Sequence, residues 1–211
     1  MSLGSSSPDF DAAAETSGEA DPRGAEGELV RAAVAGNHAA ARELHRHYYP
    51  VVSSFLRKLG VRPHDLEDAT QEVFTQFFRY VSSFRGDAQL KTWVYRLCVT
   101  EARRLRRRRR IAAALASVLK SQPAEEIAPP LFTSDRRVQE MAQDALNRMH
   151  PDQRLAFVLF EIEGLTGREA AEIAGKTVAA MFRRLYEAQR IFSESLGIEA
   201  HPHKRGTHEP V

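Results

Sequence analysis

Apolar residues recur at three- and four-residue spacings along most of this chain, which is the periodicity of helices that bury one face. The pattern begins near Glu28 and continues to about Leu119, with an interruption at Gly36–Asn37. It resumes near Val138 and continues to Leu196. No stretch alternates apolar and polar residues as a half-buried strand does. The sequence therefore predicts an all-α protein.

One predicted helix starts at Pro63 and has two distinct faces. Its apolar residues fall on a single stripe, made up of Leu66, Ala69, Val73, Phe77 and Val81. Asp68, Gln71 and Glu72 must then face elsewhere, because residues off that stripe lie on the other side of the helix. A polar turn ends this segment, and a second helix is predicted from Leu90.

Composition and proline content divide the chain into two small helical domains. The amino-terminal segment has almost no large apolar residue, so burial cannot offset the entropy of ordering it. Pro123, Pro129 and Pro130 break helices and favour extended backbone between the two periodic regions. The expected segments are a disordered acidic tail (1–27), a first domain (28–119), a linker (120–135), a second domain (136–196) and a disordered tail (197–211).

The second domain contains the signature of a helix-turn-helix. Thr166 and Glu169 have the spacing of a capping box, which opens a short helix. Gly175 can end that helix, and Thr177 can cap the next one. Two helices joined by a tight, glycine-containing turn are typical of this DNA-binding motif.

The second helix of the motif, Thr177 to Phe192, would enter a major groove with its amino-terminal part. Among its outward side chains, Arg183 suits a guanine edge and Arg184 suits a phosphate. Ala179 offers only apolar contact, and Tyr186 also faces outward. Such helix pairs also occur as plain packing elements, and the pattern alone leaves that alternative open.

The formal net charge is only +2, but the charges are segregated. Acidic residues dominate the amino-terminal tail, whereas the run from Arg103 to Arg110 is interrupted only by Leu105. A run of this kind on a helix can neutralise several phosphates, with Arg103, Arg104 and Arg107 as candidates. A solvated helix face is the plainer alternative.

Three aromatic residues, Phe84, Trp93 and Tyr95, precede the arginine run. An exposed aromatic side chain beside a basic groove can stack on an unpaired base. Packing in a core is the alternative for each of them. Their position just before the arginines favours contact with single-stranded nucleic acid.

Several function classes find no support in the sequence. The single cysteine, Cys98, excludes an internal disulfide framework and a cysteine-based zinc site. No apolar run reaches the roughly 18 to 20 residues that span a bilayer, so we expect a soluble, cytoplasmic protein. His201, His203 and His208 indicate tail composition rather than a metal site. No catalytic constellation and no phosphate-binding glycine loop is present, so we expect neither an enzyme nor a cofactor.

Two motifs resemble those of the extracytoplasmic-function (ECF) group of bacterial RNA polymerase sigma factors. Residues 65–74, DLEDATQEVF, are similar to the family's D-x-E-D-x-x-Q-E-V-F core-binding helix. Residues 91–97, KTWVYRL, are similar to its T-W-L-Y-R-I segment. The family's carboxy-terminal pattern is matched by residues 165–171 and 184–188.

The resemblance implies an initiation subunit that lends promoter recognition to core RNA polymerase. The side chains that it implies for polymerase binding are Asp65, Asp68, Gln71 and Glu72. Those for capturing and melting the minus-ten element are Phe84, Trp93, Tyr95, Arg96, Thr100, Arg103, Arg104 and Arg107. Those for reading the minus-thirty-five element are Thr177, Ala179, Arg183, Arg184 and Tyr186. The protein would act at the nucleoid, and an anti-sigma protein is a further partner that the resemblance leaves open.

Some positions depart from the family's pattern. Thr100 stands where the family usually has an asparagine that lines the pocket for a flipped base, so the resemblance does not predict the base read there. Glu101 follows beside the expected DNA path, and Arg104 replaces an acidic or polar residue. Residues 176–181, KTVAAM, replace the usual x-P-x-G-T-V, so the upstream element need not resemble the family's common one.

Two other classes of protein compete with this interpretation. One is a stand-alone helix-turn-helix regulator that does not bind polymerase, and binding to purified core enzyme separates the two. The other is a serine recombinase with a helix-turn-helix tail. It would need a strand-rich domain before the arginines, and the helical periodicity argues against one.

Overall fold

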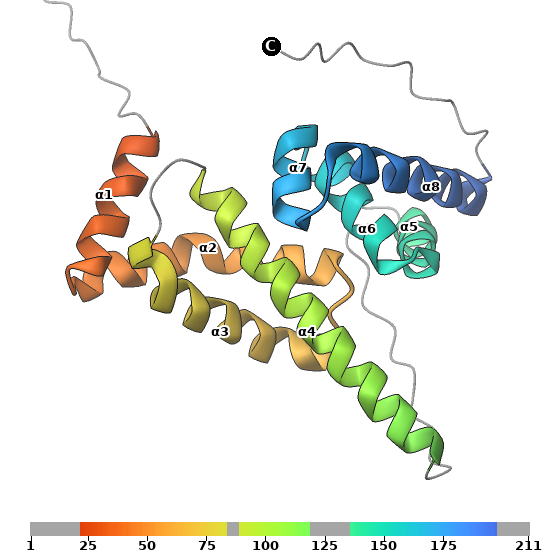
Figure 1. Ribbon diagram of the computed structural model, residues 1–211, viewed down its shortest axis with the longest axis horizontal. Helices are drawn as coiled ribbons and strands as arrows, with labels where there is room; N and C mark the ends of the chain where they lie inside the picture. The colour runs from red at the N-terminus through yellow and green to blue at the C-terminus, as the bar shows by residue number, and fades with distance from the viewer. Residues whose placement is uncertain (1–21, 84–88, 119–135, 198–211) are drawn as a thin grey trace, which may run out of the picture.

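The computed structural model describes residues 22–83, 89–118 and 136–197, and within them the chain forms helices and the turns between them (Figure 1). This confirms the all-α prediction. The first domain contains α1 (Pro22–Val34), α2 (His38–Lys58), α3 (Pro63–Tyr80), the short η1 (Val81–Ser83) and α4 (Leu90–Val118). The second contains α5 (Arg136–Arg148), α6 (Pro151–Phe157), η2 (Val158–Ile162), α7 (Gly167–Ala174) and α8 (Val178–Leu196). None of these helices is long and apolar enough to cross a bilayer.

The first helix begins earlier than the sequence pattern indicated. α1 starts at Pro22, so the expectation of a disordered tail up to residue 27 is wrong for residues 22–27. Two contacts explain the early start. The side chain of Val30 is buried, and the carboxylate of Glu26 accepts a hydrogen bond from the hydroxyl of Tyr48 on α2.

Helices α2 and α3 form as the spacing of their apolar residues predicts. Asn37 caps α2, since its side-chain oxygen accepts from the backbone amides of Ala39 and Ala40 at 2.9 and 3.2 Å. Pro63 opens α3, where its missing amide hydrogen costs nothing. The predicted stripe of α3 faces the core, with Val73 and Phe77 at most 1% exposed. The polar side of α3 is thereby directed outward.

The helix-turn-helix of the second domain has the predicted caps. Thr166 and Glu169 form a reciprocal capping box at the start of α7. Gly175 ends α7 in the left-handed region, with φ at +62°, a conformation that other residues rarely adopt. The hydroxyl of Thr177 then accepts from the amide of Ala180 at 3.2 Å and starts α8. The turn therefore holds α7 and α8 at a fixed angle.

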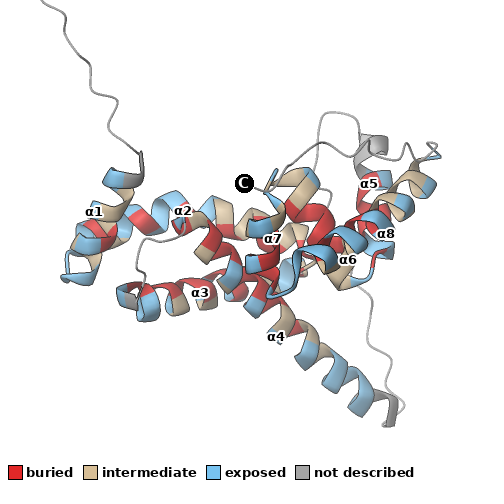
Figure 2. Ribbon diagram, turned by 45° about the horizontal axis from the view of Figure 1, so that its top comes forward, coloured by how far each residue is buried: buried red, intermediate tan, exposed pale blue. Residues whose placement is uncertain are grey.

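The two domains pack against each other, which the sequence pattern did not indicate. One continuous cluster of buried side chains contains Phe55 and Tyr95 from the first domain and Leu159 and Ile173 from the second. Figure 2 shows buried residues gathered around α2, α4 and α7. The last part of α4 extends beyond this core, and its residues 110–115 are all exposed (Figures 1 and 2).

Candidate protein and nucleic-acid interfaces

The outer face of α3 carries the acidic and amide side chains that the sequence placed there. Asp68 and Gln71 are exposed. Glu72 is half-buried and accepts a hydrogen bond from Nε2 of Gln76 at 3.0 Å. The carboxylates and the amide leave several acceptors and donors available to another protein surface.

Asp65, at the start of α3, is tied to the basic end of α4. Its carboxylate pairs with the guanidinium of Arg109 and lies 3.4 Å from Nε2 of His64. Partial burial alone would raise the pKa of Asp65, but the hydrogen bond and charge of Arg109 outweigh it, helped by His64 and Arg62. The pKa of Asp65 therefore lies below its ordinary value, and the side chain anchors α4 as well as facing outward.

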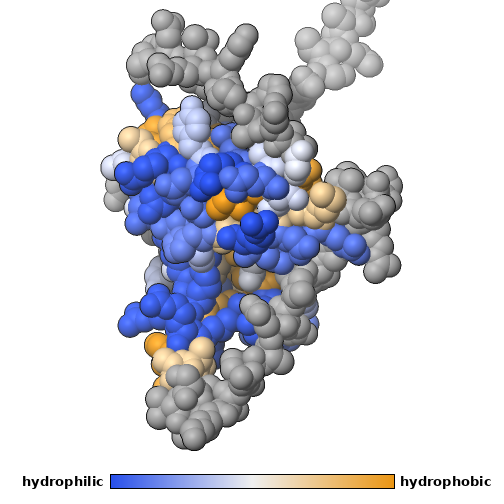
Figure 3. Space-filling view, turned by 90° about the vertical axis from the view of Figure 1, so that its right-hand side faces the viewer, coloured by the Kyte–Doolittle hydropathy of each residue, from blue (hydrophilic) through white to orange (hydrophobic). Residues whose placement is uncertain are grey.

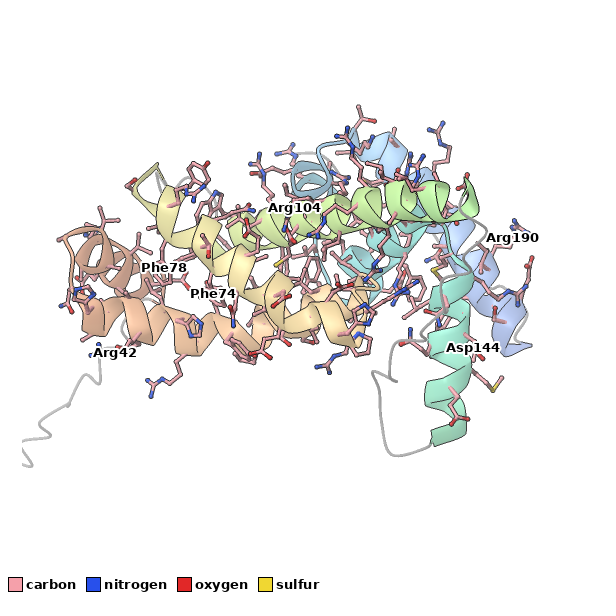
Figure 4. All side chains as sticks on the ribbon, turned by 90° about the horizontal axis from the view of Figure 1, so that it is seen from below. Arg42, Phe74, Phe78, Arg104, Asp144 and Arg190 are labelled. Carbon is pink, nitrogen blue, oxygen red and sulfur yellow. The ribbon has the colours of Figure 1, made fainter. Side chains whose placement is uncertain are left out.

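A group of aromatic side chains continues this face across α2 and α3. Phe74 lies between the two helices with Phe78 one turn further along (Figure 4). The ring of Phe74 is 4.3 Å from that of His45 and stacks almost parallel to Tyr49 at 6.5 Å. Phe78 is 38% exposed and Tyr49 is 41% exposed. Large aromatic rings that are partly exposed in this way are typical of protein-binding surfaces.

The exposed rings could have been predicted from pairs of adjacent aromatic residues in the sequence, which an analysis of apolar periodicity does not consider. Tyr49 follows Tyr48, and Phe78 follows Phe77. Adjacent residues on a helix point about 100° apart, so only one ring of each pair can face a narrow core. Tyr48 and Phe77 are buried, and their neighbours are left at the surface.

Helix α4 presents a stripe of four exposed side chains, Arg96, Thr100, Arg104 and Arg107. Their spacings of four, four and three residues place them on one side of the helix. Trp93 precedes them by one turn and is half-buried, with its ring 5.4 Å from that of Phe77. The structure thus brings five of the eight predicted minus-ten residues onto one face.

Tyr95 does not belong to this face. The sequence suggested an exposed ring, but Tyr95 is 1% exposed and stacks on Phe55 at 4.0 Å. Its hydroxyl donates a hydrogen bond to the carboxylate of Glu163. The physical reason is the packing of the second domain, which covers this turn of α4. The remaining aromatic candidate, Phe84, lies outside the described residues.

The expectation for Glu101 is also wrong. Instead of lining the DNA path, its side chain is fully buried, and its two oxygens accept from Nε and Nη2 of Arg104 at 2.7 and 2.8 Å. The hydrogen bond to Glu101 raises the pKa of Arg104. Thr100 is exposed, and its hydroxyl donates to the backbone carbonyl of Arg96 at 2.9 Å. Arg104 projects from the middle of α4 (Figure 4) with one nitrogen not used by Glu101.

The arginine run is divided between the surface and the packed interior. Arg106 is half-buried, and burial is the main cause that lowers its pKa, with the charge of Arg103 second. Arg109 is held by Asp65, and Nη2 of Arg103 donates to the carbonyl of Ala174 on α7 at 2.9 Å. The exposed members of the run are Arg104, Arg107, Arg108 and Arg110.

On α8 the outward positions agree with the sequence analysis for Ala179, Arg183 and Tyr186, which are exposed. Arg184 differs, because it is half-buried and forms an ion pair with Asp152 at 3.2 Å. Thr177 is exposed and also caps the helix. The outer face of this domain is largely hydrophilic, with small apolar spots (Figure 3).

The described residues contain no cluster of three or more histidine, cysteine or acidic side chains that could hold a metal ion. The histidines of the carboxy-terminal tail lie outside that part of the chain.

Both domains match known family models. Residues 44–111 match the model described as Sigma-70 region 2, and residues 139–190 match the one described as Sigma-70, region 4. The first match covers most of α2, all of α3 and about three quarters of α4, and the second covers α7 and most of α8.

Curated relatives include several bacterial proteins. The ECF RNA polymerase sigma factor SigE of Mycolicibacterium smegmatis is 31% identical over 150 residues, which cover 70% of this chain and 58% of that protein. The chain therefore spans less than two thirds of SigE. The ECF RNA polymerase sigma factor SigM of Mycobacterium tuberculosis (strain H37Rv) is 29% identical, covering 81% of this chain and 84% of SigM. The ECF RNA polymerase sigma-E factor of Escherichia coli K12 is 28% identical, with 76% and 88% covered.

Two solved structures share the fold. CnrH, in complex with the cytosolic domain of CnrY, superposes with a TM-score of 0.60 at 24% identity, covering 82% of this chain and 97% of CnrH. The sigma factor RpoE from Bartonella quintana, in complex with the anti-sigma factor NepR, has a TM-score of 0.65 at 22% identity. That match covers 75% of this chain and 97% of RpoE.

Proposed function

Because this chain belongs to the ECF group of the sigma-70 family of RNA polymerase sigma factors, we propose that it binds core polymerase, directs it to promoters and helps to open the DNA. The observation that carries this proposal is a pair of chemically different faces on adjacent helices, acidic on α3 and basic on α4. RNA synthesis stays with the polymerase, so the chain supplies binding rather than an active site. It would act in the cytoplasm, at the nucleoid.

The proposed polymerase-binding surface combines polar and aromatic side chains of α3. Asp68, Gln71 and Glu72 supply the hydrogen-bonding part, and Phe78 supplies an exposed ring on the same helix. An aromatic anchor surrounded by polar groups is the usual composition of a strong protein–protein contact. Asp65 is the weaker candidate, since Arg109 already occupies its carboxylate.

The proposed minus-ten surface is the exposed stripe of α4. From Arg96 to Arg107 it extends for about 16 Å, at 1.5 Å per residue, which suits several successive phosphates. Trp93, at its amino-terminal end, is the aromatic side chain placed to stack on an unpaired base. Thr100 lies between two arginines, where a base edge would meet a single hydroxyl rather than an amide.

The proposed minus-thirty-five surface is the start of α8. Arg183 is exposed there and can read a guanine edge, and Thr177 lies where backbone amides attract a phosphate. Tyr186 and Ala179 complete the outward side. Arg184 is a weaker candidate, because its ion pair with Asp152 would have to break first.

An inhibitory protein partner is part of the proposal. RpoE from Bartonella quintana was solved with an anti-sigma factor, and CnrH was solved with a cytosolic domain of CnrY. Both have the fold of this chain. We infer that this chain also binds a partner of the anti-sigma kind.

Core binding gives the most direct test of the proposed function. Gln71→Ala/Glu72→Ala should weaken binding to purified core polymerase by roughly 30-fold, the effect of losing about 2 kcal/mol at the centre of an interface. Transcription from genomic DNA by the reconstituted enzyme should fall in parallel. The control, Glu161→Ala/Gln189→Ala, removes the same residue types from a hydrogen-bonded pair in the second domain. If the wild-type chain itself does not bind core enzyme, the stand-alone regulator is correct instead.

A further inference from the structure

A stripe of apolar and aromatic side chains runs along α8, beside the proposed minus-thirty-five residues. Val178, Phe182 and Tyr186 are 39%, 42% and 55% exposed, and their spacing of four residues places them on one side of the helix. Tyr186 already belongs to the proposed minus-thirty-five surface, whereas Phe182, at the centre of the stripe, has no role there. Single exposed apolar side chains are common, but a contiguous row of them marks a binding surface.

The helix-turn-helix holds the ring of Phe182 in one position. The ring stacks on Phe160 of η2, with the ring centroids 5.1 Å apart and the planes at 28°. A Cβ atom added to Gly167, at the start of α7, would come within 3.1 Å of Cε2 of Phe182 and 3.2 Å of Cγ1 of Val178. The absence of a side chain at Gly167 therefore leaves room for the ring. A ring that is fixed before binding loses little conformational entropy when it meets a partner.

The charges around the ring suit a nucleic acid. Arg168 of α7, Lys176 in the turn and Arg183 of α8 are all exposed. In a helix-turn-helix the first helix crosses the phosphate backbone, while the start of the second helix meets the edges of the bases. Phe182 lies between these two parts, because it packs beside Gly167 of α7 and directly precedes Arg183. Its ring is therefore placed to meet the edge of a base pair.

A phenyl ring can read only one of the groups that the major groove displays. It has no hydrogen-bond donor or acceptor, so it cannot recognise the polar edges of guanine, cytosine or adenine. The C5-methyl group of thymine is the apolar feature of the groove, and Phe is among the side chains that contact it. A thymine contact from this helix also agrees with the departure of residues 176–181 from the family's usual pattern.

Building on the proposed function, we propose that Phe182 is a specificity-determining residue that contacts the methyl group of a thymine in the minus-thirty-five element. Adjacent residues of a helix point about 100° apart, so Phe182 and Arg183 meet different base pairs. The element then requires an A·T pair next to the guanine that Arg183 reads. Phe160 and Gly167 are positioning residues, since they fix the ring without touching the DNA.

Replacing thymine by deoxyuridine tests this contact, because the change removes only the methyl group and keeps the pairing with adenine. Transcription of genomic DNA by the chain with core polymerase, followed by mapping of start sites, identifies the minus-thirty-five element. Fluorescence anisotropy of this holoenzyme then measures its affinity for promoter duplexes in which each thymine of the element is replaced in turn. The wild type should lose affinity about fourfold at one thymine, which corresponds to about 0.8 kcal/mol for one buried methyl group.

Three variants assign that loss to the ring. Phe182→Ala should bind the thymine and deoxyuridine duplexes equally well at that position. Gly167→Ala keeps the ring but adds a Cβ atom that displaces it, so the fourfold preference should shrink, and this variant gives an answer even if Phe182→Ala does not fold. Tyr186→Ala is the matched control from the same stripe, and it should bind more weakly overall but keep the fourfold preference. Circular dichroism checks the folding of each variant.

The outcomes distinguish this inference from the function on which it rests. A wild type that binds every deoxyuridine duplex as tightly as the thymine duplex would overturn the inference, as would a folded Phe182→Ala variant that keeps the wild-type preference. If Phe182→Ala instead weakens binding to core polymerase and leaves the thymine preference unchanged, the stripe binds protein rather than DNA. If the wild-type chain starts no transcripts with core enzyme, the proposed function is wrong, and the inference is wrong with it.

Discussion

The buried carboxylate of Glu101 decides what the neighbouring Arg104 can do. Arg104→Ala should lower the free energy of unfolding by about 2 kcal/mol, because it leaves Glu101 buried without a countercharge. This figure is below the roughly 3 to 5 kcal/mol typical of a broken buried pair, since the Arg104 side chain is 47% exposed and partly screened. Arg107→Ala removes an exposed side chain and should change stability by less than about 0.5 kcal/mol. Urea unfolding followed by circular dichroism measures both.

Arg107→Ala should show its effect in DNA binding instead. Arg107→Ala should reduce the salt dependence of duplex binding by about 0.9 in the log–log slope, as expected for one phosphate contact. As a control for the stability effect, Glu101→Leu/Arg104→Leu removes both charges and should be more stable than Arg104→Ala. A double variant as unstable as the single one would show that Glu101 is not the cause.

The spacing of residues predicted which side chains share one face of α4, but it did not predict which positions of α4 are buried. The spacing of Arg96, Thr100 and Arg107 was sufficient to place them together, because helical geometry fixes which residues share a side. Tyr95 and Glu101 were misplaced, since both are buried. Their environment is set by Glu163 and Arg104. Periodicity carries no information about these contact partners, so it could not predict that the two side chains are buried.

At the scale of the elements, the turn between α7 and α8 depends on one glycine. Gly175 has φ at +62°, where a side chain clashes with the backbone and costs about 1 to 2 kcal/mol. Gly175→Ala should therefore lower the free energy of unfolding by about that amount and weaken binding to the minus-thirty-five element. Thermal unfolding and duplex DNA binding are the measurements.

Gly27→Ala is the control for replacing a glycine. Gly27 lies inside α1, and a Cβ there would meet its nearest neighbour, Nη1 of Arg31, only at 3.8 Å. Alanine in a helix interior is more favourable than glycine, so this variant should gain roughly 0.5 to 1 kcal/mol. If both variants lose stability equally, the left-handed turn is not the reason for the loss at Gly175.

Helix ends were predictable where a capping residue marks them and not elsewhere. Thr166, Gly175 and Thr177 fixed the boundaries of α7 and α8 from the sequence, since each has a short-range role in the backbone. α1 was placed about six residues too late. Its amino-terminal half is held by Glu26 against Tyr48, a contact 22 positions away that local composition does not show.

For the whole molecule, the sequence predicted two domains but not their packing. Each domain has its own periodic pattern, and the prolines after residue 120 correctly suggested a boundary. Besides a shared apolar core, the interface contains the buried contacts of Glu163 and Arg154, which are single charged residues in otherwise ordinary helical sequence. Charged side chains of this kind are usually solvated, so nothing local distinguishes the ones that become buried.

The interface should make stability depend on pH through Glu163. Burial opposes ionisation of this carboxylate, but Lys58, Tyr95 and Lys91 outweigh it, so its pKa lies below the ordinary value of 4.5. A lowered pKa in the folded state means that the unfolded chain binds more protons between the two values. The stabilisation is therefore complete above pH 4.5 and is lost as the pH falls through the lowered pKa. Burial raises the pKa of Tyr95, so that hydroxyl stays protonated at neutral pH.

The measurement is the difference in free energy of unfolding between the wild type and Glu163→Gln across pH 3 to 8. At neutral pH we expect about 2 kcal/mol, the usual size for hydrogen bonds to a charged group. The difference in free energy of unfolding should shrink below pH 4.5. The pKa of Asp65 is also lowered, but both proteins retain Asp65, so its effect cancels in the difference. A difference that stays constant down to pH 3 would mean that Glu163 does not act through its charge, and the other contacts between the domains, such as those of Arg154, would then hold them together.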